Sequence, residues 1–122
     1  MKTLPTFEAH CRACGRAFSH PGFGDFAYGH SVLCSTSGRH HATVDATSVA
    51  ARQVALTLDP SDKRTLWQAL AEAADPIDGE SLTASIHCPH CASSDLSSWG
   101  GRVTGHRDVP EATFEAFASA SK

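Results

Sequence analysis

Runs of alternating hydrophobic and polar residues predict strands in two parts of the chain. TFEAH is predicted to form a strand that leads into the first Cys-x-x-Cys motif, and RAFSH is predicted to form the strand that returns from it. Two β-prone runs flank Ser37, Gly38 and Arg39, and a short gap containing glycine between such runs is typical of a β-hairpin. Leu82, Ala84 and Ile86 alternate in the same way later in the chain. The predicted strands are 6–10, 16–20, 30–36, 40–46 and 80–87.

Helical spacing predicts a first helix over residues 49–58. Val49, Val54 and Leu58 lie near one face at 3.6 residues per turn, and Thr47 or Ser48 precedes them as a candidate N-cap.

A second helix is predicted after the Asp-Pro-Ser-Asp sequence at 59–62. Asp59 or Ser61 is the expected N-cap, and the segment 75–79, which contains proline and glycine, should end the helix. The residues expected on its buried face are Leu66, Trp67, Leu70 and Ala74.

A last helix over about 110–119 is predicted, opened by Asp108 and Pro110, with Phe114 and Phe117 one turn apart. Trp67 and these two phenylalanines are expected in the core. Together the elements predict an α+β fold, an antiparallel sheet with two or three helices packed on it. A chain of 122 residues with 41% hydrophobic composition fits one domain, residues 1–122.

Two Cys-x-x-Cys motifs stand near the ends of this predicted domain. Each reads His-Cys-x-x-Cys followed by a small residue, which is glycine in the first motif and alanine in the second. Two thiolates on one tight turn can bind a metal ion about 2.3 Å away, and a second turn completes a tetrahedron. The motifs therefore predict one structural Zn²⁺ held by Cys11, Cys14, Cys88 and Cys91.

This arrangement resembles the zinc-ribbon family, in which two cysteine knuckles hold one zinc ion. The resemblance covers only the knuckles, and residues 15–87 separate them, 73 residues where about 15–20 are usual. It implies a single zinc-ribbon-like domain with an insertion at about 20–85. Because many zinc ribbons contact nucleic acid or the transcription machinery, it also implies nucleic-acid binding as one candidate function.

The second motif, Cys88-Pro89-His90-Cys91, also resembles the active site of thioredoxin-like thiol–disulfide oxidoreductases. Those enzymes place the reactive cysteine at the start of a helix. The residues that follow here are rich in serine and glycine and form helices poorly. Thiol–disulfide exchange is therefore our third hypothesis, after a protein-binding module and a nucleic-acid-binding zinc ribbon. Cys34 lies among hydrophobic residues and is expected to be a buried, inert thiol.

Charge argues against nucleic acid and for a protein partner. The formal net charge is −3, and phosphate binding requires lysine and arginine concentrated on one face. Residues 59–80 hold six acids against two basic residues, which would suit a basic protein partner. The arginines near the knuckles, which would form any basic patch, are Arg12, Arg16, Arg39, Arg102 and Arg107.

The sequence carries no recognisable catalytic or targeting motif. There is no phosphate-binding glycine loop, no His-Glu-x-x-His and no nucleophile elbow, so we expect a binding or regulatory protein and no enzyme. No segment has the apolar length of a signal sequence or a membrane span, and the odd number of cysteines suits a reducing compartment. We therefore expect a cytoplasmic protein that does not contact membrane.

Overall fold

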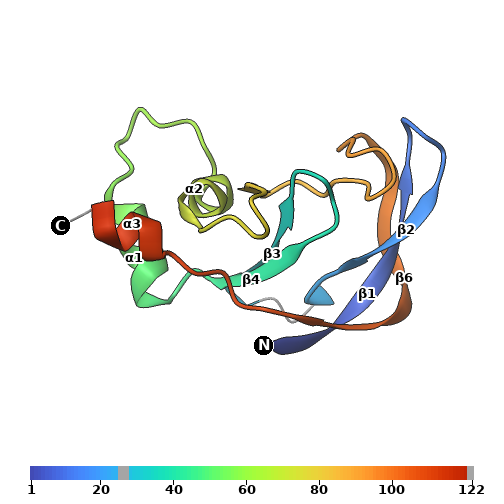
Figure 1. The fold of residues 1–122 in the computed structure, drawn as a ribbon, viewed down its shortest axis with the longest axis horizontal. Helices are drawn as coiled ribbons and strands as arrows, with labels where there is room; N and C mark the ends of the chain where they lie inside the picture. The colour runs from blue at the N-terminus through green and yellow to red at the C-terminus, as the bar shows by residue number, and fades with distance from the viewer. Residues whose placement is uncertain (25–27, 121–122) are drawn as a thin grey trace.

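The computed structural model describes residues 1–24 and 28–120, which form two small antiparallel sheets and three helices. One sheet has the order β2-β1-β6, with β1 at Lys2–Cys11, β2 at Ala17–Pro21 and β6 at Leu96–Val109. The other has the order β4-β3-β5, with β3 at His30–Ser35, β4 at His41–Asp45 and β5 at Leu82–Thr83. The helices are α1 (Val49–Leu56), α2 (Leu66–Ala73) and α3 (Glu115–Ala120). The helices gather at one end of the molecule and sheet β2-β1-β6 forms the other (Figure 1).

The α+β composition agrees with the prediction, but the strands form two three-stranded sheets instead of one, and the first sheet includes a strand, β6, that the sequence does not predict. No strand is predicted over residues 96–109, which contain serines and glycines that favour neither strand nor helix. In the structure this segment pairs with β1 from Lys2↔Val109 to Cys11↔Leu96. The register shifts between Phe7 and Ala9, where Gly100 and Gly101 adopt positive φ and form a bulge. Pairing with a distant strand, and not local preference, makes β6 a strand.

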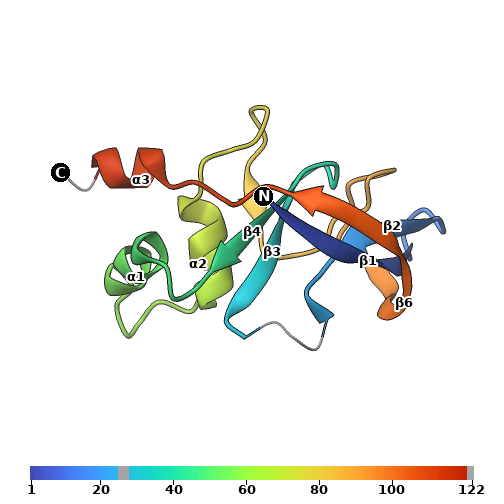
Figure 2. The same cartoon turned by 90° about the horizontal axis from the view of Figure 1, so that it is seen from below.

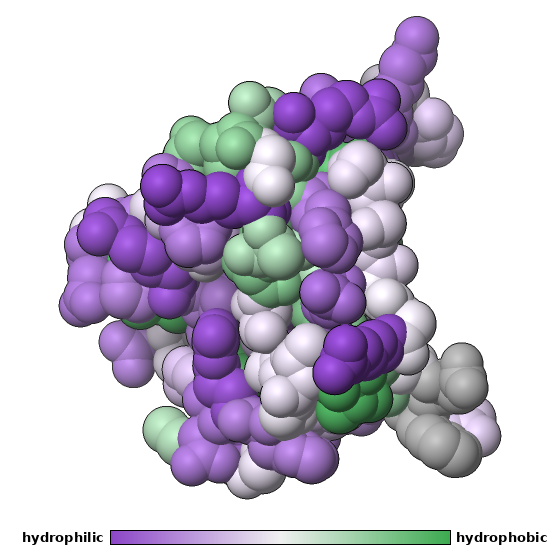
Figure 3. Space-filling model, turned by 90° about the vertical axis from the view of Figure 1, so that its right-hand side faces the viewer, coloured by the Kyte–Doolittle hydropathy of each residue, from purple (hydrophilic) through white to green (hydrophobic). Residues whose placement is uncertain are grey.

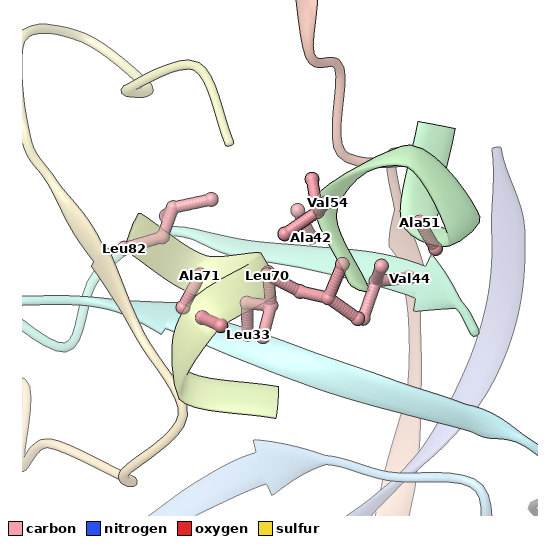
Figure 4. Packing of buried hydrophobic residues seen from close by; sticks show 9 residues of the cluster. Leu33, Ala42, Val44, Ala51, Val54, Leu70, Ala71 and Leu82 are labelled. Carbon is pink, nitrogen blue, oxygen red and sulfur yellow. The ribbon is translucent and has the colours of Figure 1, made fainter. Parts of the chain in front are cut away.

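The main hydrophobic core lies between sheet β4-β3-β5 and the first two helices. Leu33 and Leu70 are fully buried at its centre, and Figure 4 shows them between α2 and the strands. Trp67, Phe114 and Phe117 pack against this core as partly buried side chains. The other buried members are Ala42, Val44, Ala51, Val54, Ala69, Ala71 and Leu82.

The helix caps agree with the prediction for α1 and not for α2. The Ser48 hydroxyl accepts a hydrogen bond from the Ala51 N–H at the start of α1. Thr65 caps α2, accepting from the Gln68 N–H at 3.1 Å, so the predicted caps Asp59 and Ser61 are wrong. Asp59 instead accepts from the Ser61 N–H within a turn, seven residues before the first helical residue.

Two further predicted elements are shorter than expected. Of residues 80–87 only Leu82–Thr83 form a strand, because β3 offers pairing partners only at Cys34 and Ser35. The helix predicted to open at Asp108 and Pro110 begins at Glu115. Residues 110–112 lie instead beside β4. Thr43 N–H donates to the Pro110 carbonyl, and Ala112 N–H donates to the Thr43 carbonyl.

Candidate metal centre

The two Cys-x-x-Cys motifs fold into the same backbone turn. In the first knuckle Gly15 N–H donates to the Cys11 carbonyl and Cys11 N–H to the Arg16 carbonyl. In the second knuckle Ala92 N–H donates to the Cys88 carbonyl and Cys88 N–H to the Ser93 carbonyl. The residue after each second cysteine has positive φ, +75° at Gly15 and +66° at Ala92. Both turns therefore curl the backbone around a pair of sulfurs, although only the first has a glycine where this is easy.

The four sulfurs converge between the knuckles. The Sγ atoms of Cys11 and Cys91 are 3.5 Å apart, and those of Cys14 and Cys88 are 3.7 Å apart. All four lie within 4.8 Å of one another. Four ligands placed tetrahedrally at 2.3 Å from a zinc ion are separated by about 3.8 Å. The sequence-predicted ligands are thus brought together, from positions up to 80 residues apart, at distances that suit one metal ion.

Backbone N–H groups also point at the sulfurs. Cys14 N–H donates to Cys11 Sγ at 3.5 Å, and His90 N–H donates to Cys88 Sγ at 3.4 Å. The Cys14 hydrogen bond is the main cause that lowers the pKa of the Cys11 thiol to about 7. At Cys91 the Ser93 N–H acts in the same direction, but burial and three neighbouring sulfurs raise the pKa to about 12. Four thiolates this close repel one another, and a bound cation removes that repulsion.

Contacts outside the cysteines hold the knuckles side by side. Arg12 N–H donates to the Asp95 carbonyl at 2.8 Å, joining the β1–β2 turn to the loop that precedes β6 (Figure 1). Ala9, Cys11, Phe18 and Cys88 form a second, smaller buried cluster beneath the sulfurs. Cys11 and Cys88 are buried while Cys14 and Cys91 are exposed, so the centre lies at the edge of the fold.

The hairpin turn between β3 and β4 packs directly against the backbone of the second knuckle. Gly38 has φ +80°, and a Cβ atom built on it would lie 2.3 Å from the His87 carbonyl oxygen. Only glycine allows the two backbones to approach this closely. The hairpin and the knuckle therefore determine each other's position.

Neither histidine next to a knuckle belongs to the sulfur cluster. His10 Nε2 lies 3.4 Å from a Glu8 carboxylate oxygen. The His87 ring bridges Thr83 and the Ala92 carbonyl, with Nδ1 2.8 Å from that carbonyl oxygen. His87 therefore braces the second knuckle, and the ligand atoms that converge there are the four cysteine sulfurs.

The Cys88–Cys91 turn lacks the helix that thiol–disulfide oxidoreductases use. It is followed by Ala92 in a left-handed conformation and then by the strand β6. No helix dipole is therefore available to stabilise a thiolate at Cys88.

The charged residues singled out in the sequence are mostly paired. Arg64 binds both Asp62 and Glu72, and His40 lies 3.0 Å from Glu80. Asp75 accepts hydrogen bonds from the Glu115 and Ala116 N–H groups at the start of α3. The acidic segment 59–80 therefore carries less unpaired charge than its composition indicates. The knuckle end of the molecule is mainly hydrophilic, with hydrophobic residues in separate small areas (Figure 3).

The structure also brings together three ligand-type side chains that no sequence pattern indicates. His20, Cys34 and His41 are all buried and place their ligand atoms within 4.8 Å of one another. Burial lowers the pKa of His20 to about 4 and that of His41 to about 3, and it raises the pKa of the Cys34 thiol. The three residues share no motif, so only the packing of the two sheets reveals them. Cys34 is buried as expected, but it has two histidines beside it.

Beside this cluster lies a groove with a volume of about 770 Å³. His20 forms part of its wall together with Phe7, Phe23 and Trp99, and the Phe7 and Trp99 rings meet edge to face at 5.7 Å.

No protein-family model, curated protein or solved structure matches the chain. The zinc-ribbon resemblance therefore rests on the two knuckles alone. In the part of the chain that the structure describes, no helix is long and apolar enough to span a membrane.

Proposed function

We propose that Cys11, Cys14, Cys88 and Cys91 hold one structural Zn²⁺ and that the domain works by binding a protein partner. The observation that carries the metal assignment is the convergence of four sulfurs at near-tetrahedral spacing. A zinc ion with four cysteine ligands has no open position for water or substrate, which argues for a structural role.

The physical task of this zinc ion is to join two segments that lie far apart in the chain. The first knuckle ends β1, and the second lies between the β5 and β6 strands. Zinc binding contributes on the order of 10 kcal/mol in small structural sites. A domain of this size, with a main core of small side chains, would depend on that contribution.

Metal analysis and melting curves test the structural role. Purified protein should contain zinc, and Cys88→Ser should lose one equivalent of it. A chelator should lower the melting temperature of Cys34→Ser, whose knuckles are intact, much more than that of Cys88→Ser, whose four-cysteine site is already broken. Parent-like melting of Cys88→Ser, together with loss of a thiol-exchange activity, would show instead that the second motif is a redox couple.

A basic protein is the partner class we propose, with nucleic acid as the alternative. The support is the negative net charge and the acids of segment 59–80, although many of these are internally paired. Glu72 is the best probe because its side chain remains about half exposed, at 48%. Asp75 is unsuitable because it caps α3.

The partner class is tested with a pull-down and binding kinetics. For a partner captured from native lysate, Glu72→Gln should slow association more than the matched variant Arg16→Gln, since rim charges act mainly on association rates. Labelled single- and double-stranded DNA and RNA should not bind at moderate salt. Binding that weakens steeply as salt increases, together with a larger effect of Arg16→Gln, would favour the nucleic-acid alternative.

A further inference from the structure

Three ligand-type side chains meet between the two sheets, away from the four-cysteine cluster. Cys34 on β3 and His41 on β4 are direct cross-strand partners, so both side chains project from the same face of sheet β4-β3-β5. His20 comes from β2 in the other sheet, and its ring centroid lies 4.7 Å from that of His41. The exposed fractions are 3% for His20, 1% for Cys34 and 7% for His41.

Three of the four imidazole nitrogens in this cluster have no hydrogen-bond partner in the protein. Within residues 1–24 and 28–120, the buried side-chain nitrogen or oxygen atoms without a hydrogen-bond partner are His20 Nδ1, His20 Nε2 and His41 Nε2. Each buried polar atom left without a partner costs about 1–3 kcal/mol. The three unpartnered nitrogens belong to two adjacent rings, so the destabilisation is concentrated at one place. This indicates that a bound ion or ligand supplies the missing partner.

We propose that His20, Cys34 and His41 form a second metal-binding site, for a thiophilic transition-metal ion of the Zn²⁺ class. One thiolate and two neutral imidazoles are a ligand set that such ions prefer. Tetrahedral coordination separates such ligand atoms by about 3.4–3.6 Å. The three ligand atoms lie within 4.8 Å of one another, so small rotations of the side chains would bring them to this spacing.

Three protein ligands leave one coordination position open, unlike the four-cysteine centre. Because His20 also forms part of the wall of the 770 Å³ groove, an ion could enter from that side and could take a fourth ligand there. Metal sites with three protein ligands and one exchangeable position are those that bind water or small ligands.

Arg107 competes with the ion for His41. Its Nη1 donates to His41 Nδ1 at 3.0 Å, which places the proton of a neutral ring on Nε2. A metal ion at Nε2 must displace that proton, and an ion at Nδ1 must displace Arg107 itself. The guanidinium charge also repels a divalent cation. Because Arg107 is exposed on β6, an ion that binds His41 would displace its guanidinium into solvent and not into the core.

The test uses protein loaded with one equivalent of Zn²⁺ and titrated with Co²⁺. Co²⁺ binds such ligands more weakly than Zn²⁺, so it should leave the four-cysteine centre occupied. We expect about one further equivalent to bind, with visible d–d bands and a thiolate-to-cobalt charge-transfer band. Cys34→Ala should abolish the charge-transfer band, and His41→Gln should weaken binding at least tenfold.

Two variants make the test specific. Arg107→Gln removes the competing charge and offers an amide oxygen to His41 Nδ1–H, so it should tighten Co²⁺ binding severalfold. His106→Ala, which removes an exposed histidine from the same strand, should change nothing. Circular dichroism and retention of the first zinc equivalent establish that each variant is folded.

The proposal would be overturned if Co²⁺ added to the protein that already holds one zinc ion produced no absorption band. It would also be overturned if the band survived both Cys34→Ala and His41→Gln in folded protein. Neither result bears on the four-cysteine centre, whose zinc is measured separately.

Discussion

Gly38→Ala should destabilise the protein far more than an ordinary glycine substitution, because it drives the β3–β4 turn into the second knuckle. Gly38 has φ +80°, and its added Cβ would lie 2.3 Å from the His87 carbonyl oxygen and 2.8 Å from the Cys88 carbonyl carbon. Ordinary van der Waals contact begins near 3.4 Å, so the backbones must separate by about 1 Å. The left-handed conformation costs about 1–2 kcal/mol and the overlap about 1–3 kcal/mol more. We therefore expect a loss of about 2–5 kcal/mol.

Gly79→Ala is the matched control for this prediction. Gly79 has nearly the same φ, +76°, but nothing lies within 4 Å of its built Cβ. It should lose only the conformational part, about 1–2 kcal/mol. Urea unfolding of the zinc-loaded variants measures both losses, and competition with a chromophoric chelator measures zinc affinity. Gly38→Ala should weaken zinc binding at least about tenfold because Cys88 moves with its carbonyl, whereas Gly79→Ala should leave it unchanged. Equal losses of stability and equal zinc affinity in the two variants would refute the proposed coupling.

Three other predictions concern the knuckles, the last helix and the buried histidines. Ala92→Gly should stabilise the protein by about 1 kcal/mol, because Ala92 has φ +66° and glycine adopts this conformation without strain, while Gly15→Ala at the matching position should destabilise it by about 1–2 kcal/mol in the same urea experiment. Asp75→Ala should cost about 1 kcal/mol and speed amide exchange in residues 115–120, because Asp75 caps α3; unchanged exchange there would argue against the cap. The folded-state pKa of His20, about 4, lies below its ordinary value of 6.5, so the unfolded chain takes up the proton first. With the four-cysteine centre loaded and no ion at His20, Cys34 and His41, the protein should therefore lose about 3 kcal/mol through this ring as the pH falls from 6.5 to about 4, and His20→Leu should lose correspondingly less. Parallel losses in the parent and His20→Leu would contradict the assigned pKa.

The candidate four-cysteine centre was predictable because the spacing of the cysteines within each motif indicates a metal-binding turn. Each Cys-x-x-Cys pair specifies a turn by itself, and two such turns specify a tetrahedral set of ligands without knowledge of the fold. The hydrophobic pattern likewise placed the β3–β4 hairpin and the first two helices, whose burial depends on nearby residues.

Features that depend on distant contacts were not predictable. The strand β6 has little strand preference of its own and forms because β1 offers an edge. The start of α3 is set by Asp75, which lies 40 residues earlier than Glu115, and no local signal at Pro110 could reveal that. The His20–Cys34–His41 cluster depends on how two sheets meet. Neither hydrophobic periodicity nor a short sequence motif indicates that residues from three different strands will lie together.

The pairing of β1 with β6 also bears on the order in which the chain is made. Cys14 leaves the ribosome 74 residues before Cys88, and at about 5–20 residues per second this delay is about 4–15 s. During that interval β1 has only β2 beside it, and the edge that β6 will occupy is open. A nascent chain therefore displays two bare thiols and an unpaired strand edge, both of which attract chaperones, oxidants and other chains. If the four cysteines hold a zinc ion as proposed, its capture comes late and marks a chain whose synthesis has passed residue 91.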